Sequence, residues 1–94
     1  MSQYWVYIMG SEHGKAVYIG VTNNLRRRVQ EHKADFIEGF TKQYRCHKLL
    51  YFEQYNEITD AIAREKQLKG WLRAKKEALI STINPEREDL AYCL

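Results

Sequence analysis

The side chains of greatest chemical interest are two tyrosines, an arginine, a histidine and a glutamate from separate parts of the chain: Tyr7, Tyr18, Arg28, His32 and Glu65. Side chains of these types can bind an anion, transfer a proton and hold a cation. Each also has a plainer interpretation. Paired tyrosines are typical of cross-strand packing, a helical histidine of a structural hydrogen bond, and a single arginine of surface charge. Their chemistry therefore depends on whether the fold brings them together.

The first elements predicted are two strands, because residues 4–9 and 16–21 are short, β-branched and aromatic. A polar stretch with two glycines separates them, which predicts a β-hairpin. A hairpin symmetric about this loop would place Tyr7 opposite Tyr18, with Gly20 at the strand end. One face would then be core and the other would carry the tyrosines. Since Gly20 has no side chain, another group could approach the backbone closely there, so this face could hold a site.

A helix is predicted after the hairpin, with Thr22 or Asn23 as its N-cap. One face of this helix follows the i, i+3, i+4, i+7 spacing and carries Leu25, Arg28, Val29 and His32. The arginine and the histidine would therefore lie one turn apart and point the same way.

A second helix is predicted from Thr59 as N-cap to residue 69, with Gly70 ending or bending it. Glu65 lies within its apolar stripe, which consists of Ala61, Leu68 and Leu72. An unpaired buried carboxylate is costly, so Glu65 must be salt-bridged, protonated, placed at a cleft or bound to a cation. The salt-bridge interpretation would use one of three arginines, Arg26, Arg27 or Arg28.

The remaining pattern predicts a third strand at residues 47–54, a loop at 35–46 and a third helix at 72–82, stopped by Asn84-Pro85. The inward residues expected in this last helix are Ala74, Ala78, Leu79 and Thr82. This order predicts an α+β fold, a three-stranded antiparallel sheet flanked by helices. We expect a single domain over residues 1–94, with a core of about 3–83 and a C-terminal surface extension at 84–94.

The composition supports a folded domain with basic helices. With 45% hydrophobic residues and one proline, the 94-residue chain lacks the signatures of disordered and fibrous proteins. The net charge of +3 is concentrated in residues 25–34 and 58–80, which indicates either solvated helix faces or contacts with a polyanion. No leader or spanning segment is visible, so we expect a cytoplasmic protein without membrane contact. Cys46 and Cys93 are expected to be reduced thiols outside any zinc site.

The order of these motifs resembles the GIY-YIG nuclease superfamily, in particular its small stand-alone bacterial branch. Trp5-Val6-Tyr7 stands at the first motif, and Tyr18-Ile19-Gly20 matches the second letter for letter, eleven residues on from tyrosine to tyrosine. Residues 21–32 and 63–71 extend the resemblance over nearly the whole chain. Two departures are Trp5, where the motif has glycine, and the late asparagine of the family, for which the match is Asn84.

The resemblance implies hydrolysis of phosphodiester bonds. By motif position, Tyr7 and Tyr18 correspond to the motif tyrosines, Arg28 to the phosphate-contacting arginine and His32 to the active-site histidine. Glu65 would hold one divalent cation, Mg²⁺ or Mn²⁺, because such hard ions accept a single carboxylate together with water and phosphate oxygens. The supporting residues would be Gly20 and Asn84.

Proton transfer would fall to the tyrosines. The charge of Arg28 is expected to lower the pKa of a nearby tyrosine from about 10. Tyr7 or Tyr18 would then help to deprotonate the attacking water, while His32 orients that water or shares its proton. The sequence leaves the choice between the two tyrosines open.

We therefore expect a metal-dependent nuclease with a role in DNA repair. DNA is the favoured substrate, and RNA stays open as the alternative because contacts to the 2′-hydroxyl decide between them. A domain this small can touch only a few nucleotides, which favours branched or single-stranded substrates. The expected nucleic-acid contacts are Arg26, Arg27, Lys69 and Arg73. Two alternatives stay open: a non-catalytic nucleic-acid-binding module of the same fold, and a small interaction protein whose helices dock onto another subunit. The sequence identifies no protein partner.

Overall fold

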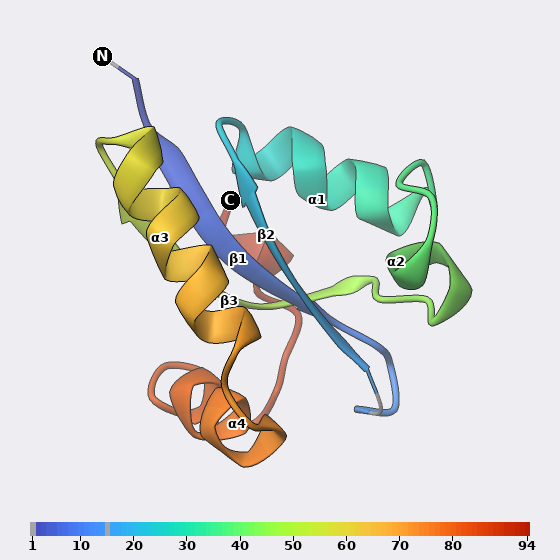
Figure 1. Cartoon of the computed structure of the whole chain (residues 1–94). Helices are drawn as coiled ribbons and strands as arrows, with labels where there is room; N and C mark the ends of the chain where they lie inside the picture. The colour runs from blue at the N-terminus through green and yellow to red at the C-terminus, as the bar shows by residue number, and fades with distance from the viewer. Residues whose placement is uncertain (1, 15) are drawn as a thin grey trace.

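A three-stranded antiparallel sheet forms the centre of the molecule in the computed structural model, which describes residues 2–14 and 16–94. The strands are β1 (Tyr4–Gly10), β2 (Val17–Thr22) and β3 (Lys48–Tyr55). Their order is β2-β1-β3, so β2 lies at an edge of the sheet (Figure 1). The predicted sheet is confirmed, and its third strand is displaced by one residue from the predicted range.

The register of the β1–β2 hairpin differs from the prediction by two residues. Tyr7 lies opposite Gly20, and Tyr18 lies opposite Met9. A two-residue shift leaves every side chain on its expected face, because side chains alternate with a period of two. The two tyrosines therefore share a face as predicted, although they are not direct cross-strand partners.

The turn of the hairpin explains the shift. The amide N–H of Gly14 donates to the carbonyl of Ser11 at 3.2 Å, and Gly14 has a φ of +71°, which favours glycine. The Ser11 N–H donates to the Ala16 carbonyl at 3.0 Å and continues the ladder past the strands. The loop is therefore centred later in the chain than its composition suggests.

In the described part of the chain, four α-helices and one 3₁₀ helix pack around the sheet: α1 (Leu25–Lys33), α2 (Phe40–Gln43), α3 (Ile58–Lys69), α4 (Arg73–Ser81) and η1 (Leu90–Cys93). The three predicted helices are present, but two N-caps were predicted wrongly. Asn24 caps α1, where its side-chain oxygen accepts from the Arg27 N–H at 3.0 Å, and Glu57 stands at the N-cap of α3. The short α2 lies within the predicted loop.

Both faces of the sheet are packed. On one face, Ala61 and Leu68 of α3 cover a core that contains Val6, Ile8 and Ile19. On the other face, α1 covers a second core, whose buried residues include Tyr7, Met9, Leu25 and Val29. The face that carries the tyrosines is therefore also covered, because α1 packs against it. Figure 1 shows α1 and α3 on either side of β2.

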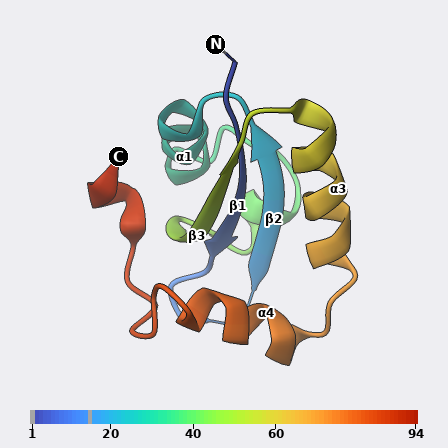
Figure 2. The ribbon, with the colours of Figure 1, turned by 90° about the vertical axis from the view of Figure 1, so that its left-hand side faces the viewer.

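The helix α4 closes one end of the sheet (Figure 2). Its fully buried residue is Ile80, with Leu79 partly buried. The other residues predicted to point inward, Ala74, Ala78 and Thr82, are exposed. Leu72 is also exposed, because α3 ends at Lys69 and its apolar stripe does not continue into the next helix.

The chain remains packed after residue 83. Leu90 is buried in the second core. Asn84 is buried and donates from its side-chain amide to the Leu50 carbonyl at 3.1 Å and to the Glu88 carbonyl at 2.8 Å. The radius of gyration is 12.3 Å, the value expected for one compact domain of this length.

Two further features concern the cysteines and the membrane. Both cysteines are free thiols, Cys46 buried and Cys93 exposed, as predicted. Among residues 2–14 and 16–94, no helix combines the length and the apolar character needed to span a bilayer.

Candidate active site

Three aromatic rings meet beneath the β2 edge. The hydroxyl oxygen of Tyr7 lies 2.9 Å from Nε2 of His32, and the two residues are 0% and 1% exposed. Tyr18 completes the group, with its ring centroid 5.5 Å from that of His32 and 6.3 Å from that of Tyr7. Strands β1 and β2 and the last turn of α1 each contribute one ring, and we call Tyr7, Tyr18 and His32 the ring cluster.

Gly20 provides the space that the Tyr7 ring occupies. A Cβ atom at this position would lie 2.5 Å from the Tyr7 hydroxyl oxygen and 2.6 Å from Cζ. These separations are far shorter than van der Waals contact. The group that approaches the backbone at Gly20 is therefore the phenol of Tyr7 itself.

Burial keeps the pair of Tyr7 and His32 neutral. It raises the pKa of Tyr7 to about 12, although a hydrogen bond from Arg28 acts in the opposite direction. It lowers the pKa of His32 to about 4, and the charge of Arg28 adds to this effect. The expectation that Arg28 lowers the pKa of this tyrosine below 10 is wrong for Tyr7, because desolvation of a buried phenolate outweighs the nearby cation.

One nitrogen of the cluster has no partner. Nδ1 of His32 is buried and makes no hydrogen bond with any residue that the structure describes. Buried polar atoms are usually paired, so an unpaired nitrogen beside the tyrosine–histidine hydrogen bond requires an explanation, of which a catalytic role is one.

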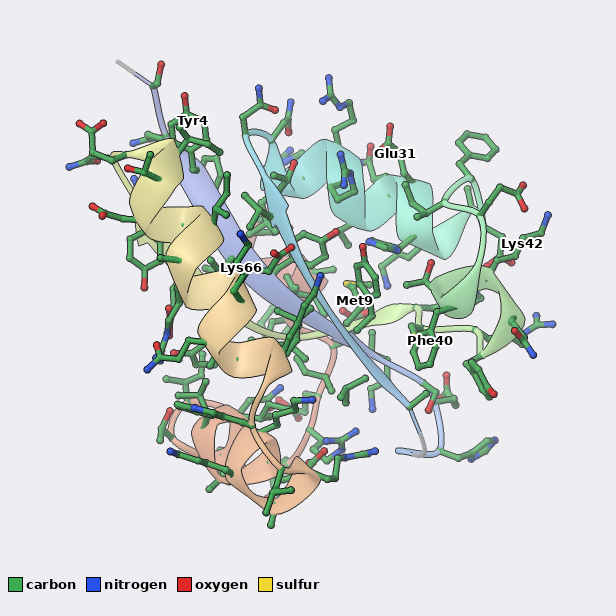
Figure 3. The ribbon with its side chains drawn as sticks, viewed as in Figure 1. Tyr4, Met9, Glu31, Phe40, Lys42 and Lys66 are labelled. Atoms are coloured by element: carbon green, nitrogen blue, oxygen red, sulfur yellow. The ribbon has the colours of Figure 1, made fainter. Side chains whose placement is uncertain are left out.

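Arg28 borders the ring cluster on the solvent side. Its side chain is 31% exposed, and its Nε donates to Oε1 of Glu31 at 3.1 Å. Burial opposes its charge, but hydrogen bonds and charge interactions with Tyr7 and Glu31 keep the pKa of Arg28 raised. The sequence analysis missed Glu31, which Figure 3 shows on α1; its i, i+3 spacing from Arg28 was the available signal. A guanidinium held this way can still offer donors to an anion.

Glu65 approaches the cluster from α3, across the β2 edge. Its side chain is 20% exposed, and a carboxylate oxygen lies 3.3 Å from Nζ of Lys69. The predicted arginine partners were wrong, since the ion pair forms one turn along the same helix. After burial and the Tyr18 interaction, the charge of Glu65 adds to the raised pKa of Tyr7 as the weakest of the causes.

The available ligands fit one type of cation. Within the described ranges, no group of three or more histidine, cysteine, aspartate or glutamate side chains could hold a metal ion. Glu65 offers one carboxylate, which is paired with the exposed Lys69. The carboxylate of Glu31 accepts a hydrogen bond from Arg28. A hard ion such as Mg²⁺ suits this donor set, because it keeps several waters and binds through one or two carboxylates and substrate phosphates.

The predicted nucleic-acid contacts differ in their surroundings. Arg26 and Arg27 are exposed on α1, and Lys69 is exposed beside Glu65. Arg73 instead has its Nε 2.9 Å from Glu77 and contacts the Gly14 carbonyl, so it joins α4 to the hairpin loop.

Asn84 lies in a different environment. Its side-chain hydrogen bonds go to backbone atoms of Leu50 and Glu88. Within the part of the chain that the structure describes, none joins Asn84 to the ring cluster.

The fold is that of a GIY-YIG domain. Residues 3–78 match the GIY-YIG catalytic domain, and the chain therefore belongs to this family. Within it, the chain is similar to small UPF0213 proteins. It is 38% identical over 88 residues to the UPF0213 protein of Syntrophus aciditrophicus, a match that covers 93% of this chain and 99% of that one. It is 31% identical to a UPF0213 protein of Natronomonas pharaonis, over 85% of this chain and 93% of the relative.

A solved structure shows the same architecture. The solution NMR structure of a UPF0213 protein from Bacillus halodurans aligns with a TM-score of 0.59 at 25% identity. The alignment covers 93% of this chain and 92% of the other. The similarity therefore extends over nearly the whole chain.

Proposed function

We propose that this protein is a metal-dependent nuclease that hydrolyses phosphodiester bonds in DNA. The observation that carries the proposal is the convergence of Arg28, the ring cluster and Glu65 at the β2 edge. Phosphodiester hydrolysis needs a cation near the phosphate, a group that handles the proton of the attacking water, and stabilisation of the leaving oxygen. Residues from β1, β2, α1 and α3 supply candidates for each requirement.

In this proposal, Arg28 binds the scissile phosphate. Its guanidinium is partly exposed, and the contacts with Glu31 and Tyr7 fix its position before substrate arrives. Glu65 would hold Mg²⁺ or Mn²⁺, which when bound neutralises charge on the phosphoryl oxygens and stabilises the leaving 3′-oxygen. Lys69 would give up its exposed ion pair with Glu65, at little cost in free energy.

Tyr18 is the tyrosine that we assign to the attacking water. It is half-buried in the edge strand, whereas Tyr7 is fully buried and has a pKa of about 12. Tyr18 would accept the water's proton or orient the water through its hydroxyl. Tyr7 and His32 are then positioning residues. Their hydrogen bond fixes the His32 ring, against which Tyr18 packs, and the Tyr7 hydroxyl, which lies beside Arg28.

The size of the domain supports a substrate that exposes its backbone locally. With a radius of gyration of 12.3 Å, the protein can contact few nucleotides. We propose single-stranded or branched DNA as the substrate and a role in DNA repair. DNA and RNA would be distinguished at the 2′-hydroxyl.

The test is cleavage of labelled single-stranded, duplex, nicked and flapped DNA, with matching RNA, in Mg²⁺, Mn²⁺ or chelator. We expect cutting that requires a divalent cation and that falls at least about 100-fold in Glu65→Gln, because the metal contributes several kcal/mol in the transition state. The matched control is Glu38→Gln, a carboxylate that pairs with Lys42 of α2. Cutting that persists in chelator or in Glu65→Gln would refute the assignment of the metal site.

The binding-module alternative also has support in the structure. Glu65 already forms an ion pair with Lys69, and the Tyr7 hydroxyl already pairs with Nε2 of His32 beneath the surface. A protein of this kind would bind nucleic acid with strong salt dependence and cut none of the substrates with either metal. That result would replace the nuclease proposal with this alternative.

A further inference from the structure

Two aromatic rings, one at the start of α2 and one at its C-cap, are exposed on the surface. Phe40 and Tyr44 are 45% and 49% exposed, and their ring centroids lie 4.7 Å apart at an interplanar angle of 42°. Figure 3 shows Phe40 on the side of α2 that faces the β1–β2 loop. Neither ring belongs to the two hydrophobic cores. Exposed, mutually packed rings that stabilise no core are typical of a binding surface.

A hollow of about 520 Å³ lies beside Tyr44, between the hairpin loop and the end of α2. Its volume is in the range of roughly 300–1,000 Å³ that is typical of small-molecule sites. Most of the lining side chains are polar or aromatic: Ser11, Glu12, His13, Gln43, Tyr44 and His47. These groups can hydrogen-bond to the edge of a heterocyclic ring as well as stack on its face.

Arg45 adds a cation to the same hollow. It is exposed, and its guanidinium makes no hydrogen bond or ion pair with any other residue described by the structure. Its φ is +53°, the left-handed conformation that glycine adopts more easily after a helix. The conformation is therefore unfavourable to stability, while the free guanidinium is suited to stack on a base or to contact a phosphate.

The hollow is next to the ring cluster. Ala16 lines it and stands two residues before Tyr18, about 7 Å along the chain. His47 also lines the hollow, and its Nε2 lies 2.8 Å from Oδ1 of Asp35. Burial and the charge of Arg28 lower the pKa of His32, and the charge of His47 lowers it further. A strand whose phosphate lies at Arg28 could therefore place a neighbouring nucleotide in the hollow.

We propose that Phe40, Tyr44 and Arg45 form a stacking site for an unpaired base of a single-stranded polynucleotide bound at the β2 edge. This inference rests on the proposed function and adds the surface that selects unpaired nucleotides. Every base can stack on an aromatic ring, and a cation beside the rings attracts the negatively charged phosphate backbone. A duplex keeps its bases stacked inside and cannot offer one to this surface. The combination of rings, cation and polar hollow fits a nucleotide better than an apolar protein segment.

The test measures binding of a short labelled thymidine strand by fluorescence anisotropy, in a Glu65→Gln background that prevents cutting. Tyr44→Leu should weaken binding about 5- to 50-fold, because one stacking partner is lost. Both proteins should bind an otherwise identical abasic strand equally. The matched control is Tyr92→Leu, an exposed tyrosine on η1, which should bind as the parent does.

A second variant keeps the inference open to refutation if Tyr44→Leu folds poorly. Arg45→Gly should weaken binding of the intact strand yet raise the melting temperature, since glycine favours the left-handed conformation. A structural role for Arg45 would give the opposite change in melting temperature.

Three outcomes would overturn the inference. If Tyr44→Leu binds the intact strand as tightly as the parent, or weakens the intact and abasic strands equally, no base stacks on this surface. If cation-dependent cutting that requires Glu65 is seen alongside either result, the proposed function stands without the stacking site. If the wild type neither binds nor cuts any strand, both proposals fail together.

Discussion

His32 combines complete burial with a single hydrogen bond, and this determines how the site should respond to acid. The imidazole is neutral in the folded state, because burial holds its pKa near 4. In an unfolded chain a histidine titrates at about 6.5. The unfolded state therefore takes up a proton in a range where the folded state does not.

The resulting prediction is a loss of stability on acidification. Between about pH 6.5 and pH 4 the unfolded state binds the extra proton, so the free energy of unfolding should fall by about 2 kcal/mol from pH 7.5 to pH 5. Urea denaturation at these two values measures the difference. His32→Gln should remove most of it, whereas His13→Gln should keep it. Equal losses in wild type and His32→Gln would assign the effect to other groups.

The sequence indicated which residues gather at the site but not how deeply they lie. The motifs around Tyr7 and Tyr18 and the helical spacing of Arg28 and His32 place these side chains near one another. Their pKa values depend on burial, and burial depends on α1 covering the sheet face, which no local pattern encodes. For that reason the expected fall in the pKa of Tyr7 was wrong.

At the scale of elements, α3 must be held against the sheet for Glu65 to reach the ring cluster. Glu53 of β3 anchors it. The carboxylate accepts hydrogen bonds from Nε and Nη2 of Arg64, each at 3.0 Å, and from the hydroxyls of Tyr51 and Tyr55 at 2.5 and 2.7 Å. The Arg64 guanidinium also lies 5.2 Å from the Trp71 ring centroid. The network joins β3 to the middle and the end of α3.

We predict that Glu53→Ala lowers the free energy of unfolding by about 2 kcal/mol or more, because it leaves Arg64 and two hydroxyls without their acceptor. Cleavage by the remaining folded protein should also fall, as α3 and Glu65 shift. Thermal unfolding and the cleavage rate measure the two effects. Glu57→Ala, an exposed residue whose side chain makes no capping hydrogen bond, is the control and should change neither by much. A stable, fully active Glu53→Ala variant would contradict this role.

The type of each element was predictable from the sequence, whereas the strand register and the inward face of α4 were not. Alternation and β-branching indicated the three strands, and helical spacing indicated α1, α3 and α4. The hairpin register depends on the conformation of Gly14, which composition does not reveal. The inward face of α4 was missed because the break at Gly70 resets the helical phase, so Ile80 is buried where Ala78 was expected. The four-residue α2 is too short to produce a periodic signal.

For the whole molecule, the net charge of +3 matters through its placement. Arg26 is exposed at the start of α1, close in sequence to the predicted phosphate ligand Arg28. Arg73 is instead part of the contact between α4 and the hairpin loop. Two arginines that the sequence grouped as nucleic-acid contacts therefore have different surroundings.

We predict that Arg26→Gln weakens binding to all single strands and reduces the slope of log K against log salt by about 0.7, the value for one lost phosphate contact. Arg73→Gln should leave that slope unchanged and lower the melting temperature. Anisotropy titrations between about 50 and 200 mM salt, together with thermal unfolding, separate the two effects. The same change of slope in both variants would mean that Arg73 also contacts the backbone of the nucleic acid.

The interlocking of Tyr7 with Gly20 also restricts the order in which the chain can evolve. Any side chain at position 20 would collide with the phenol ring, whose nearest atoms stand 2.5 to 2.9 Å from the site of a Cβ. A lineage that keeps the tyrosine therefore has glycine as the only residue that fits at position 20. Position 20 can accept another residue only after Tyr7 has been replaced by a residue without the ring. Once position 20 carries a side chain, that side chain prevents a tyrosine from fitting again at position 7. Loss of this phenol is thus an evolutionary step that a single later substitution can make irreversible.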